Sequence, residues 1–544
     1  MTEYKVFLVH SLEKVLPDQE PRKREAPDLY GFTGEVLSVQ IAYTCANDDF
    51  GESDTSLWIE PSVSDAVQIH LRSVGLVPSN YPCHGTVDND YVSTRPGLYP
   101  DVLLPIESGE RLKAIPLQWR SVWVDIDAQS GRHEITLKVL CEEGEIADLR
   151  LTIYVSEKAL PQQTLIHTEW FHTDCLADYY RVPVFSDEHW RIIENFISSA
   201  ASHGINALLT PVFTPPLDTG VGGERTTVQL VNITLNDSVY HFDFSLLEKW
   251  IELCEKHGIT YLEIAHLFSQ WGAVYAPKIM VCIKGRLEQR FGWHTPATGK
   301  EYTEFLQAFL PALKDFLKGK GWLDKTFFHI SDEPHMEEVE TYRAAREIVK
   351  PLLEGCRVMD AISSFDVFKE DIIDHPVVSV DHIHEFIDAK INPLWAYYCT
   401  IQAVDVPNRF MAMPGTRNRV LGVLLYYYHL EGFLHWGFNF YNAKRSARHI
   451  DPYLVTDADE SFPSGDAFLV YPAPNGTAYE SLRGVILKQA LWDMRALQLY
   501  EQISSRDAVI ALIDSLCEHK MSFTEYPRDI TFFDLLRKQL YQLV

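Results

Sequence analysis

The sequence predicts a multidomain β plus α/β protein, in which an N-terminal β-sandwich is followed by a (β/α)8 TIM-like barrel. Two changes of pattern lead to this prediction. Residues 1–160 contain short apolar or alternating runs separated by turn residues, which is typical of an antiparallel sandwich. From residue 161 onward, strands alternate with helices, and eight such strands indicate a (β/α)8 barrel. The length of 544 residues also favours more than one domain.

The N-terminal segment contains six candidate strands. They cover residues 4–9, 34–43, 66–71, 119–125, 134–141 and 149–155. Turn residues separate them, for example at 47–49 and 130–131. The segment has no cluster of residues with catalytic chemistry. We therefore expect residues 1–160 to form a sandwich domain joined to the barrel by a linker at 161–163.

The barrel is expected to span residues 161–505. Its eight candidate strands cover residues 165–167, 206–213, 260–265, 327–331, 357–362, 377–382, 394–400 and 432–440. Apolar residues at three- and four-residue steps predict helices over 187–203, 245–258, 303–319, 335–355, 365–373, 416–430 and 484–503. A polar hairpin is expected over 228–242, and residues 506–544 are expected to form a helical tail packed on the barrel.

Charge and composition limit the classes of partner. The formal net charge is −28, which disfavours nucleic acid and anionic membranes because both are polyanions. Residues 1–9 lack the apolar core of a secretory signal, and no apolar window is long enough to span a membrane, so a cytoplasmic location is expected. The nine cysteines are scattered without a C-x-x-C pair, which favours free thiols and no zinc site. No cofactor is expected, and either a monomer or a dimer is compatible with the sequence.

The most informative motif is Asp332-Glu333-Pro334, which follows the apolar run at 326–330. In α/β folds, chemistry is placed at the carboxyl ends of the strands. Cleavage of a glycoside needs a carboxylic acid that protonates the leaving oxygen. Two adjacent carboxylates raise one another's pKa, which keeps one of them protonated. A helix N-terminus that favours acidic residues is the structural alternative, and the position at a strand end favours the catalytic interpretation.

Aromatic and polar side chains follow several of the other predicted strands. Because these strand ends meet at one face of a barrel, they predict a pocket suited to sugars, whose C–H faces lie against aromatic rings. The candidate substrate-binding residues are Trp170, Asp174, His266, His384, Glu385, Tyr397, Trp436 and Asn439. Trp271 and Trp293 are expected in a loop.

A retaining glycosidase also needs a nucleophile, and the seventh predicted strand contains no carboxylate. Glu385, Glu263 and Glu169 are possible substitutes. In a different solution, the 2-acetamido oxygen of an N-acetylhexosamine attacks its own anomeric carbon and forms an oxazolinium. Glu333 is then the acid/base, and Asp332 orients the acetamide.

A second motif, His382-x-His384 flanked by Asp381 and Glu385, raises the question of a metal site. Two histidines at i and i+2 of a strand point to the same side and could share a metal. The ligand set is incomplete, because the eighth strand lacks an aspartate. We therefore expect hydrogen-bonding histidines and no metal.

Four stretches together resemble glycoside hydrolase family 123. Residues 329–334 resemble its catalytic motif, and residues 169–177 and 432–441 resemble its first and last barrel strands. Segments within 465–483 resemble the loop and helix start that follow. The resemblance covers nearly the whole chain, because the family also carries an N-terminal sandwich.

The resemblance implies an exo-acting β-N-acetylgalactosaminidase that works by substrate assistance, with Glu333 as acid/base and Asp332 as the acetamide-orienting residue. A carbohydrate substrate is the expected partner. Two alternatives stay open. One is a retaining glycosidase with a carboxylate nucleophile acting on a sugar without an acetamide, and the other is a non-catalytic carbohydrate-binding protein.

Overall fold

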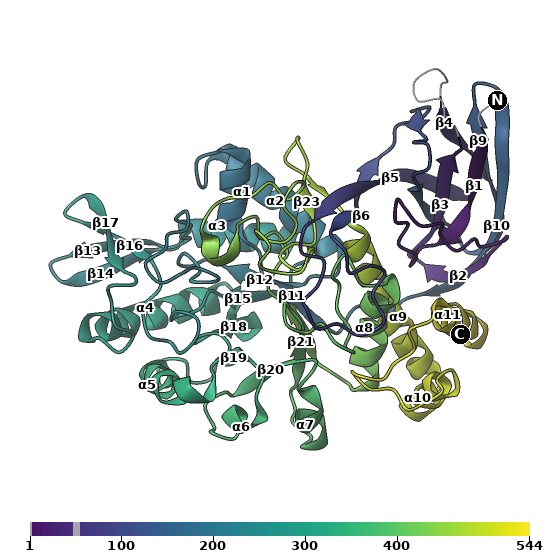
Figure 1. The fold of residues 1–544 in the computed structure, drawn as a ribbon. Coiled ribbons are helices and arrows are strands. Elements are labelled where there is room, and N and C mark those ends of the chain that lie inside the picture. The colour runs from purple at the N-terminus through teal and green to yellow at the C-terminus, as the bar shows by residue number, and fades with distance from the viewer. Residues whose placement is uncertain (1–2, 47–54) are drawn as a thin grey trace.

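The computed structural model describes residues 3–46 and 55–544, so the turn predicted at 47–49 lies outside the described residues. Two five-stranded sheets form the N-terminal part, and a closed eight-stranded parallel barrel follows. Figure 1 shows the sandwich and the barrel side by side, with α8, α9 and α11 between them. The predicted fold class, a β-sandwich followed by a TIM-like barrel, is confirmed.

The sandwich contains ten strands in the described residues. One sheet has the order β1 (Tyr4–His10), β3 (Val36–Cys45), β8 (Arg120–Ala128), β5 (Val67–Ser79), β6 (Gly97–Pro105). The other has the order β2 (Asp28–Thr33), β10 (Gly144–Ala159), β9 (Gly131–Cys141), β4 (Ser56–Ser62), β7 (Leu112–Lys113). Alternate side chains such as Val39, Val124 and Leu137 are fully buried between the sheets, which forms an apolar core separate from that of the barrel.

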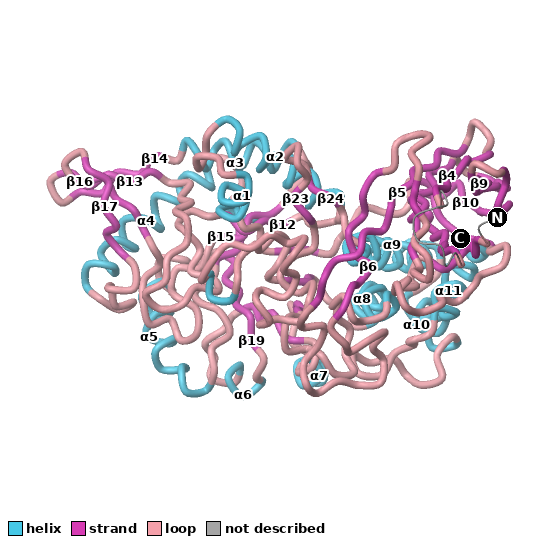
Figure 2. Tube along the Cα trace, turned by 45° about the horizontal axis from the view of Figure 1, so that its top comes forward, coloured by secondary structure: helices cyan, strands magenta, loops and turns pink. Residues whose placement is uncertain are grey.

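The sandwich also contributes to the mouth of the barrel. Strands β5 and β6 extend away from the sandwich toward the barrel (Figure 2). Their connecting loop, residues 80–96, contacts the loop that follows the seventh barrel strand: Tyr91 Oη donates to Ala403 O at 2.7 Å, and Val92 N donates to Ala412 O at 2.9 Å. His84 Nε2 lies 2.5 Å from Thr400 O. The N-terminal domain therefore fixes part of the barrel's functional face.

All eight predicted barrel strands are present, and six of them are shorter than expected. In closed order they are β11 (Ile166–Glu169), β12 (Ala207–Thr210), β15 (Tyr261–Ile264), β18 (Thr326–Phe328), β19 (Arg357–Ile362), β20 (His375–Ser379), β21 (Trp395–Tyr397) and β22 (Gly432–His435). Gly432 is required where β22 begins, because a Cβ there would lie 2.2 Å from the indole ring of Trp395. The sixth strand ends at Ser379, three residues before the predicted end at residue 382.

Helices surround the barrel (Figure 1). They are α1 (Thr173–Tyr180), α2 (Asp187–Ser202), α3 (Ser245–Lys256), α4 (Lys300–Gly319), α5 (Val339–Val349), α6 (Phe365–Phe368), α7 (Ile383–Asp388), α8 (Gly415–Tyr427) and α9 (Leu482–Ile503). The predicted hairpin over 228–242 is β13 (Asn232–Asn236) and β14 (Val239–Asp243), and it joins β16 (Ile279–Ile283) and β17 (Arg286–Phe291) in one four-stranded sheet. A short ribbon, β23 (Tyr471–Pro472) with β24 (Ala478–Tyr479), precedes α9.

The C-terminal tail contains α10 (Arg506–Ser515) and α11 (Ile530–Leu543). Helix α11 lies against the sandwich as well as against α9. Its Arg537 pairs with Glu35 of the sandwich and lies 3.5 Å from Asp493 of α9. The tail, which the sequence predicted to pack on the barrel, therefore also contacts the sandwich. Within the described residues, no helix has the length and apolarity that a membrane span requires.

Candidate active site

The strand β18 leads directly into the predicted carboxylate pair. Backbone hydrogen bonds continue past the strand, from Leu267 N to His329 O at 3.1 Å and from Phe268 N to Ile330 O at 3.0 Å. Trp271 N then donates to Asp332 O at 3.3 Å. Glu333 has a φ of +43°, a left-handed conformation that is strained for a residue with a side chain. The backbone turns sharply here, and both carboxylates line one pocket.

The pocket has a volume of about 130 Å3 and lies at the carboxyl ends of the barrel strands. It is lined by Trp170, Leu217, Asp218, Gln270, Trp271, Asp332, Glu333, Ala361, Tyr397, Cys399, Thr400, Leu434, Trp436 and Phe462. Five candidate catalytic and substrate-binding residues line the pocket: Asp332, Glu333, Trp170, Tyr397 and Trp436. Trp271, which was expected in a loop, lines it as well. Gln270 and Asp218 were missed, because each follows its strand by several residues and lies in a loop of irregular length.

The environment of the pair favours protonation. Burial raises the pKa of Asp332, and the adjacent negative charge of Glu333 raises it further. Gln270 Nε2 donates to Asp332 Oδ2 at 2.8 Å, which opposes the shift. Burial also raises the pKa of Glu333, while the Tyr397 hydroxyl, which donates to Glu333 Oε1, acts in the opposite direction. Two carboxyls with raised pKa values can hold one proton between them near neutral pH.

A fully buried charged network lies beneath the pocket. His329 has Nε2 at 2.6 Å from Glu263 Oε1 and Nδ1 at 3.0 Å from Asp360 Oδ1. Burial alone would lower the pKa of His329, but these two carboxylates outweigh it and raise the pKa to about 10. Trp170 Nε1 donates to Glu263 Oε1 at 2.7 Å. The network therefore fixes the indole of Trp170, which lines the pocket.

His266 belongs to this floor and does not line the pocket. Its ring stacks on His329 with a centroid distance of 4.2 Å and an interplanar angle of 16°. His266, His329 and Asp360 are the one group among the described residues whose ligand atoms are close enough to share a metal. Nearly parallel stacked rings cannot aim two in-plane lone pairs at one ion, and both nitrogens of His329 already face carboxylates. The donor set does not fit a metal ion.

The candidates His384 and Glu385 lie away from the pocket, on helix α7. His384 packs against Tyr428 and Phe523 at ring distances of 6.2 Å and 6.3 Å, and Glu385 is exposed in the first turn. The prediction that His382 and His384 share a strand is wrong, because β20 ends at Ser379 and His382 is the N-cap of the helix. Residues i and i+2 of a helix point to different sides. The structure therefore does not support a metal shared by His382 and His384.

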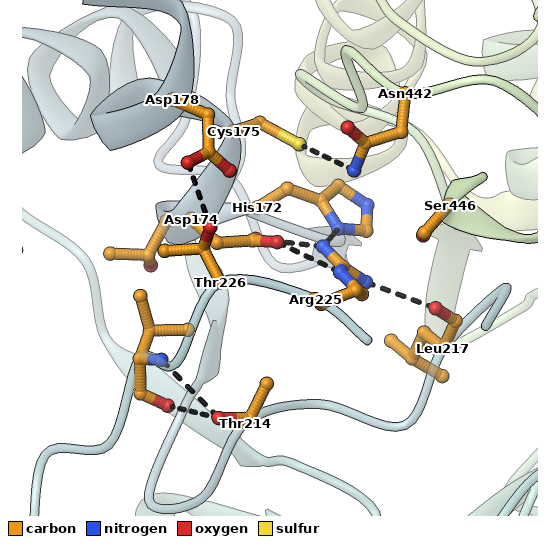
Figure 3. Close-up of polar contacts among 12 residues, drawn as sticks. His172, Asp174, Cys175, Asp178, Thr214, Leu217, Arg225, Thr226, Asn442 and Ser446 are labelled. Atoms are coloured by element: carbon orange, nitrogen blue, oxygen red, sulfur yellow. Dashed lines mark hydrogen bonds and ion pairs between the residues drawn. The ribbon is translucent and has the colours of Figure 1, made fainter. Parts of the chain in front are cut away.

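Asp174 and Asn439 are also fully buried and make contacts within the protein. Figure 3 shows Asp174 with its partner Arg225. The Asp174 carboxylate accepts from Arg225 Nη2 at 2.7 Å and from Arg225 Nε at 2.8 Å. Asn439 exchanges hydrogen bonds with the backbone of His172 at 2.8 Å and 3.1 Å. Neither side chain lines the pocket, so the structure does not place them where a direct substrate contact was predicted. Arg225, which pairs with Asp174, comes from a distant loop.

The carboxylates weighed as nucleophiles do not line the pocket. Glu169 is fully buried and accepts from Arg409 Nη1 at 2.5 Å and Nη2 at 3.0 Å. Glu263 is held by His329 and Trp170, and Glu385 is on the outer helix. Besides Asp332 and Glu333, the carboxylate that lines the pocket among the described residues is Asp218, which the sequence did not suggest.

A closed (β/α)8 barrel with two adjacent carboxylates in a pocket at its fourth strand defines a class of protein, the barrel glycoside hydrolases. Residues 170–500 match the family model described as the glycoside hydrolase 123 catalytic domain. The chain therefore belongs to glycoside hydrolase family 123. The resemblance seen in the sequence motifs is confirmed. A search of curated proteins gave no match.

Among solved structures, the chain is similar to a family 123 glycoside hydrolase from Clostridium perfringens, whose study concerns glycolipid glycan hydrolysis. The TM-score is 0.73 at 16% identity, over 99% of this chain and 97% of the other. A family 39 glycoside hydrolase from Bacteroides cellulosilyticus WH2 has a TM-score of 0.33 at 10% identity, over 85% and 81% of the two chains. The first similarity covers the sandwich and the barrel together.

Proposed function

We propose that the chain is a retaining β-N-acetylhexosaminidase that removes a terminal sugar with the help of the sugar's own acetamide. N-Acetylgalactosamine is favoured from the resemblance of the sequence motifs. Glu333 is the acid/base, and Asp332 orients the acetamide. The substrate is a glycan or glycoside. The study of the Clostridium relative concerns glycolipid glycans, and this supports a glycolipid glycan as one candidate.

One observation carries the assignment of roles: each carboxylate has one occupied and one available oxygen. Gln270 holds Oδ2 of Asp332, and Tyr397 holds Oε1 of Glu333. Within residues 3–46 and 55–544, no hydrogen bond engages the other oxygen of either group. Asp332 can thus accept from an acetamide N–H, and Glu333 can transfer a proton to or from a bound substrate.

The reaction follows in two steps. The acetamide oxygen attacks C1, the glycosidic C–O bond breaks, and the proton of Glu333 passes to the leaving oxygen. The resulting oxazolinium carries positive charge, which the Asp332 carboxylate stabilises. Glu333 then removes a proton from water as the water attacks C1, the oxazolinium ring opens, and the acetamide is restored. Two inversions at C1 retain the β-configuration.

Aromatic residues around the pair support a sugar as the substrate. Trp170 and Trp436 line the pocket, and Trp271 is 41% exposed at its edge. Indole faces provide apolar surface for the C–H faces of a pyranose, while the carboxylates accept from its polar groups. The same pocket would also suit a glycosidase that does not recognise an acetamide. The two mechanisms differ in their nucleophile, which is the acetamide oxygen in one and a carboxylate in the other.

The test measures release of p-nitrophenol from the β-N-acetylgalactosaminide, β-N-acetylglucosaminide, β-galactoside and β-glucoside. We expect cleavage of the acetamido sugars alone and tight inhibition by a thiazoline analogue of the oxazolinium. Asp332→Asn is expected to lower kcat/KM by about 10²–10⁴-fold. The matched control is Glu385→Gln, which removes an exposed carboxylate and leaves activity unchanged. Cleavage of the plain hexosides, or a loss in Glu385→Gln alone, would contradict substrate assistance.

A further inference from the structure

We propose that Asp218 is the specificity-determining residue of this pocket, and that its carboxylate binds the hydroxyls on C3 and C4 of the sugar ring. The inference rests on the proposed function, because it takes the acetamide at Asp332 as the reference point. It adds a recognition site for O3 and O4 of the terminal sugar. The O4 contact is the one that can separate galacto from gluco substrates.

Asp218 lies in the loop after β12 and lines the pocket together with Gln270 and Asp332. Its Oδ2 accepts from Arg445 N at 2.8 Å. Within the described parts of the chain, its Oδ1 has no hydrogen-bond partner. A half-buried carboxylate oxygen without a partner at the wall of a pocket is an acceptor for a ligand's O–H.

Gln270 sets the spacing between Asp218 and Asp332. Its side-chain carbonyl accepts from Asp218 N at 2.5 Å, and its amide nitrogen donates to Asp332 Oδ2 at 2.8 Å. One planar amide group therefore joins the backbone at Asp218 to the Asp332 carboxylate. In the proposed pose, Glu333 faces C1 and Asp332 faces the substituent on C2, so the continuation of the ring, C3 and C4, lies toward Gln270 and Asp218. The available Oδ1 of Asp218 has two lone pairs and can accept from two vicinal hydroxyls, which suits this place.

Contacts on two sides hold the loop that carries Asp218, and Figure 3 shows the one between Arg225 and Leu217. Arg225 is 5% exposed, pairs with Asp174, and donates from Nη1 to Leu217 O at 3.0 Å. On the other side, Ser446 Oγ donates to Asp218 O at 2.8 Å. Asp218 itself has a φ of +37°, a left-handed conformation. Such conformations persist where surrounding contacts impose them, and they are concentrated at ligand sites.

These contacts also give Asp174 a role. It does not touch the pocket, but it fixes Arg225, which fixes the carbonyl of Leu217 directly before Asp218. Asp174 and Arg225 are therefore positioning residues for the carboxylate that meets the sugar. Preorganised acceptors bind more strongly than mobile ones, because less conformational entropy is lost when the ligand binds.

The experiment compares Asp218→Asn with wild type on p-nitrophenyl β-N-acetylgalactosaminide and on its 3-deoxy and 4-deoxy analogues. For the full sugar we expect kcat/KM to fall about 10–100-fold, mainly through KM, as for the loss of a hydrogen bond to a charged group. For the 3-deoxy and 4-deoxy analogues, which each lack one of the two partner hydroxyls, the ratio of wild type to variant should be smaller than for the full sugar. The matched control is Glu224→Gln, an exposed carboxylate in the same loop that pairs with Lys278, and it should behave as wild type.

Inhibition constants for galacto- and gluco-configured thiazolines give an independent measure of binding. The ratio of the two constants should move toward 1 in Asp218→Asn and stay unchanged in Glu224→Gln. Equal losses on the full and deoxy sugars would show a merely structural effect and overturn the proposal.

The remaining outcomes separate this inference from the proposed function. If Asp332→Asn loses activity and Asp218→Asn keeps wild-type selectivity, the inference fails and the proposed function stands. If Asp218→Ala loses kcat and azide restores turnover as an α-glycosyl azide, Asp218 is the nucleophile, and both proposals fail. If wild type cleaves no acetamido sugar, the proposed function fails and the inference fails with it.

Discussion

The hydroxyl of Tyr397, at the end of the seventh barrel strand, donates to Oε1 of Glu333, which follows the fourth strand. The two residues are 64 positions apart in the chain. This bond occupies one oxygen of Glu333, the proposed acid/base, and leaves the other oxygen available to a substrate. It also lowers the pKa of Glu333 against the upward effect of burial, so it adjusts the pH at which the proton is available.

The first prediction concerns this bond. Tyr397→Phe removes the donor, so the pKa of Glu333 rises and the alkaline limb of the kcat/KM profile moves to higher pH. The optimum value of kcat/KM should fall by about 3–30-fold, because one oxygen of Glu333 loses its partner in the pocket. The measurement is kcat/KM for an acetamido sugar from pH 4 to 10. An unchanged alkaline limb would mean that Glu333 does not set it.

The second prediction is a bell-shaped pH dependence for the wild-type enzyme. In the proposed mechanism, activity needs Asp332 ionised and Glu333 protonated, so it falls below the lower apparent pKa and above the upper one. Burial raises the pKa of both groups, so both limbs should lie above the ordinary carboxyl values of about 4. In Asp332→Asn the residual activity should lose its acid limb. A profile that is flat from pH 4 to 8 would contradict the coupled pair.

The third prediction tests the role of Glu333 with substrates that differ in their leaving group. Glu333→Gln cannot donate a proton, so substrates with a poor leaving group should lose about 10³-fold or more in kcat/KM. A dinitrophenyl glycoside needs no protonation and should lose less than about 10-fold in its first step. The measurement is the slope of log kcat/KM against the pKa of the leaving phenol for a series of aryl glycosides. If all substrates lose the same factor, Glu333 is not the general acid.

The fourth prediction concerns stability. His329→Gln leaves Glu263 and Asp360 buried without their cation, and breaking such a pair typically costs about 3–5 kcal/mol. Urea unfolding at neutral pH measures the loss, with His382→Gln as the control because the side chain of His382 is 55% exposed. The folded pKa of about 10 exceeds the unfolded value of 6.5, so the stabilisation is complete below pH 6.5 and is lost as pH rises through 10. The difference between variant and wild type should therefore shrink at pH 10.5.

The fold and the position of the Asp332–Glu333 pair could be predicted from the sequence because both depend on short-range patterns. Alternating apolar runs in the first part and eight strand–helix units in the second follow from local periodicity. Asp332 and Glu333 come directly after an apolar run, so the end of the strand placed them at the functional face. Trp170, Tyr397 and Trp436 reached the pocket for the same reason.

The partners of the polar side chains were decided by the tertiary structure. Asp174 also follows the first strand, but it pairs with Arg225, 51 residues away, and does not line the pocket. His384 was misplaced because β20 ends three residues early and a helix begins at Ile383. Asp218 and Gln270, 52 residues apart, meet only because two barrel loops are folded against each other.

By itself, the sequence determined the fold class, the family and the position of Asp332 and Glu333 at the end of a strand. These features depend on alternation along strands and on neighbouring residues, which are local in the sequence. The tertiary structure alone decided which side chains line the pocket, because a buried polar group must find a partner and the choice of partner depends on packing between distant loops. Among the described residues, one oxygen of Asp218 has no partner and faces the pocket, whereas Asp174, which has the same carboxylate, is paired with Arg225.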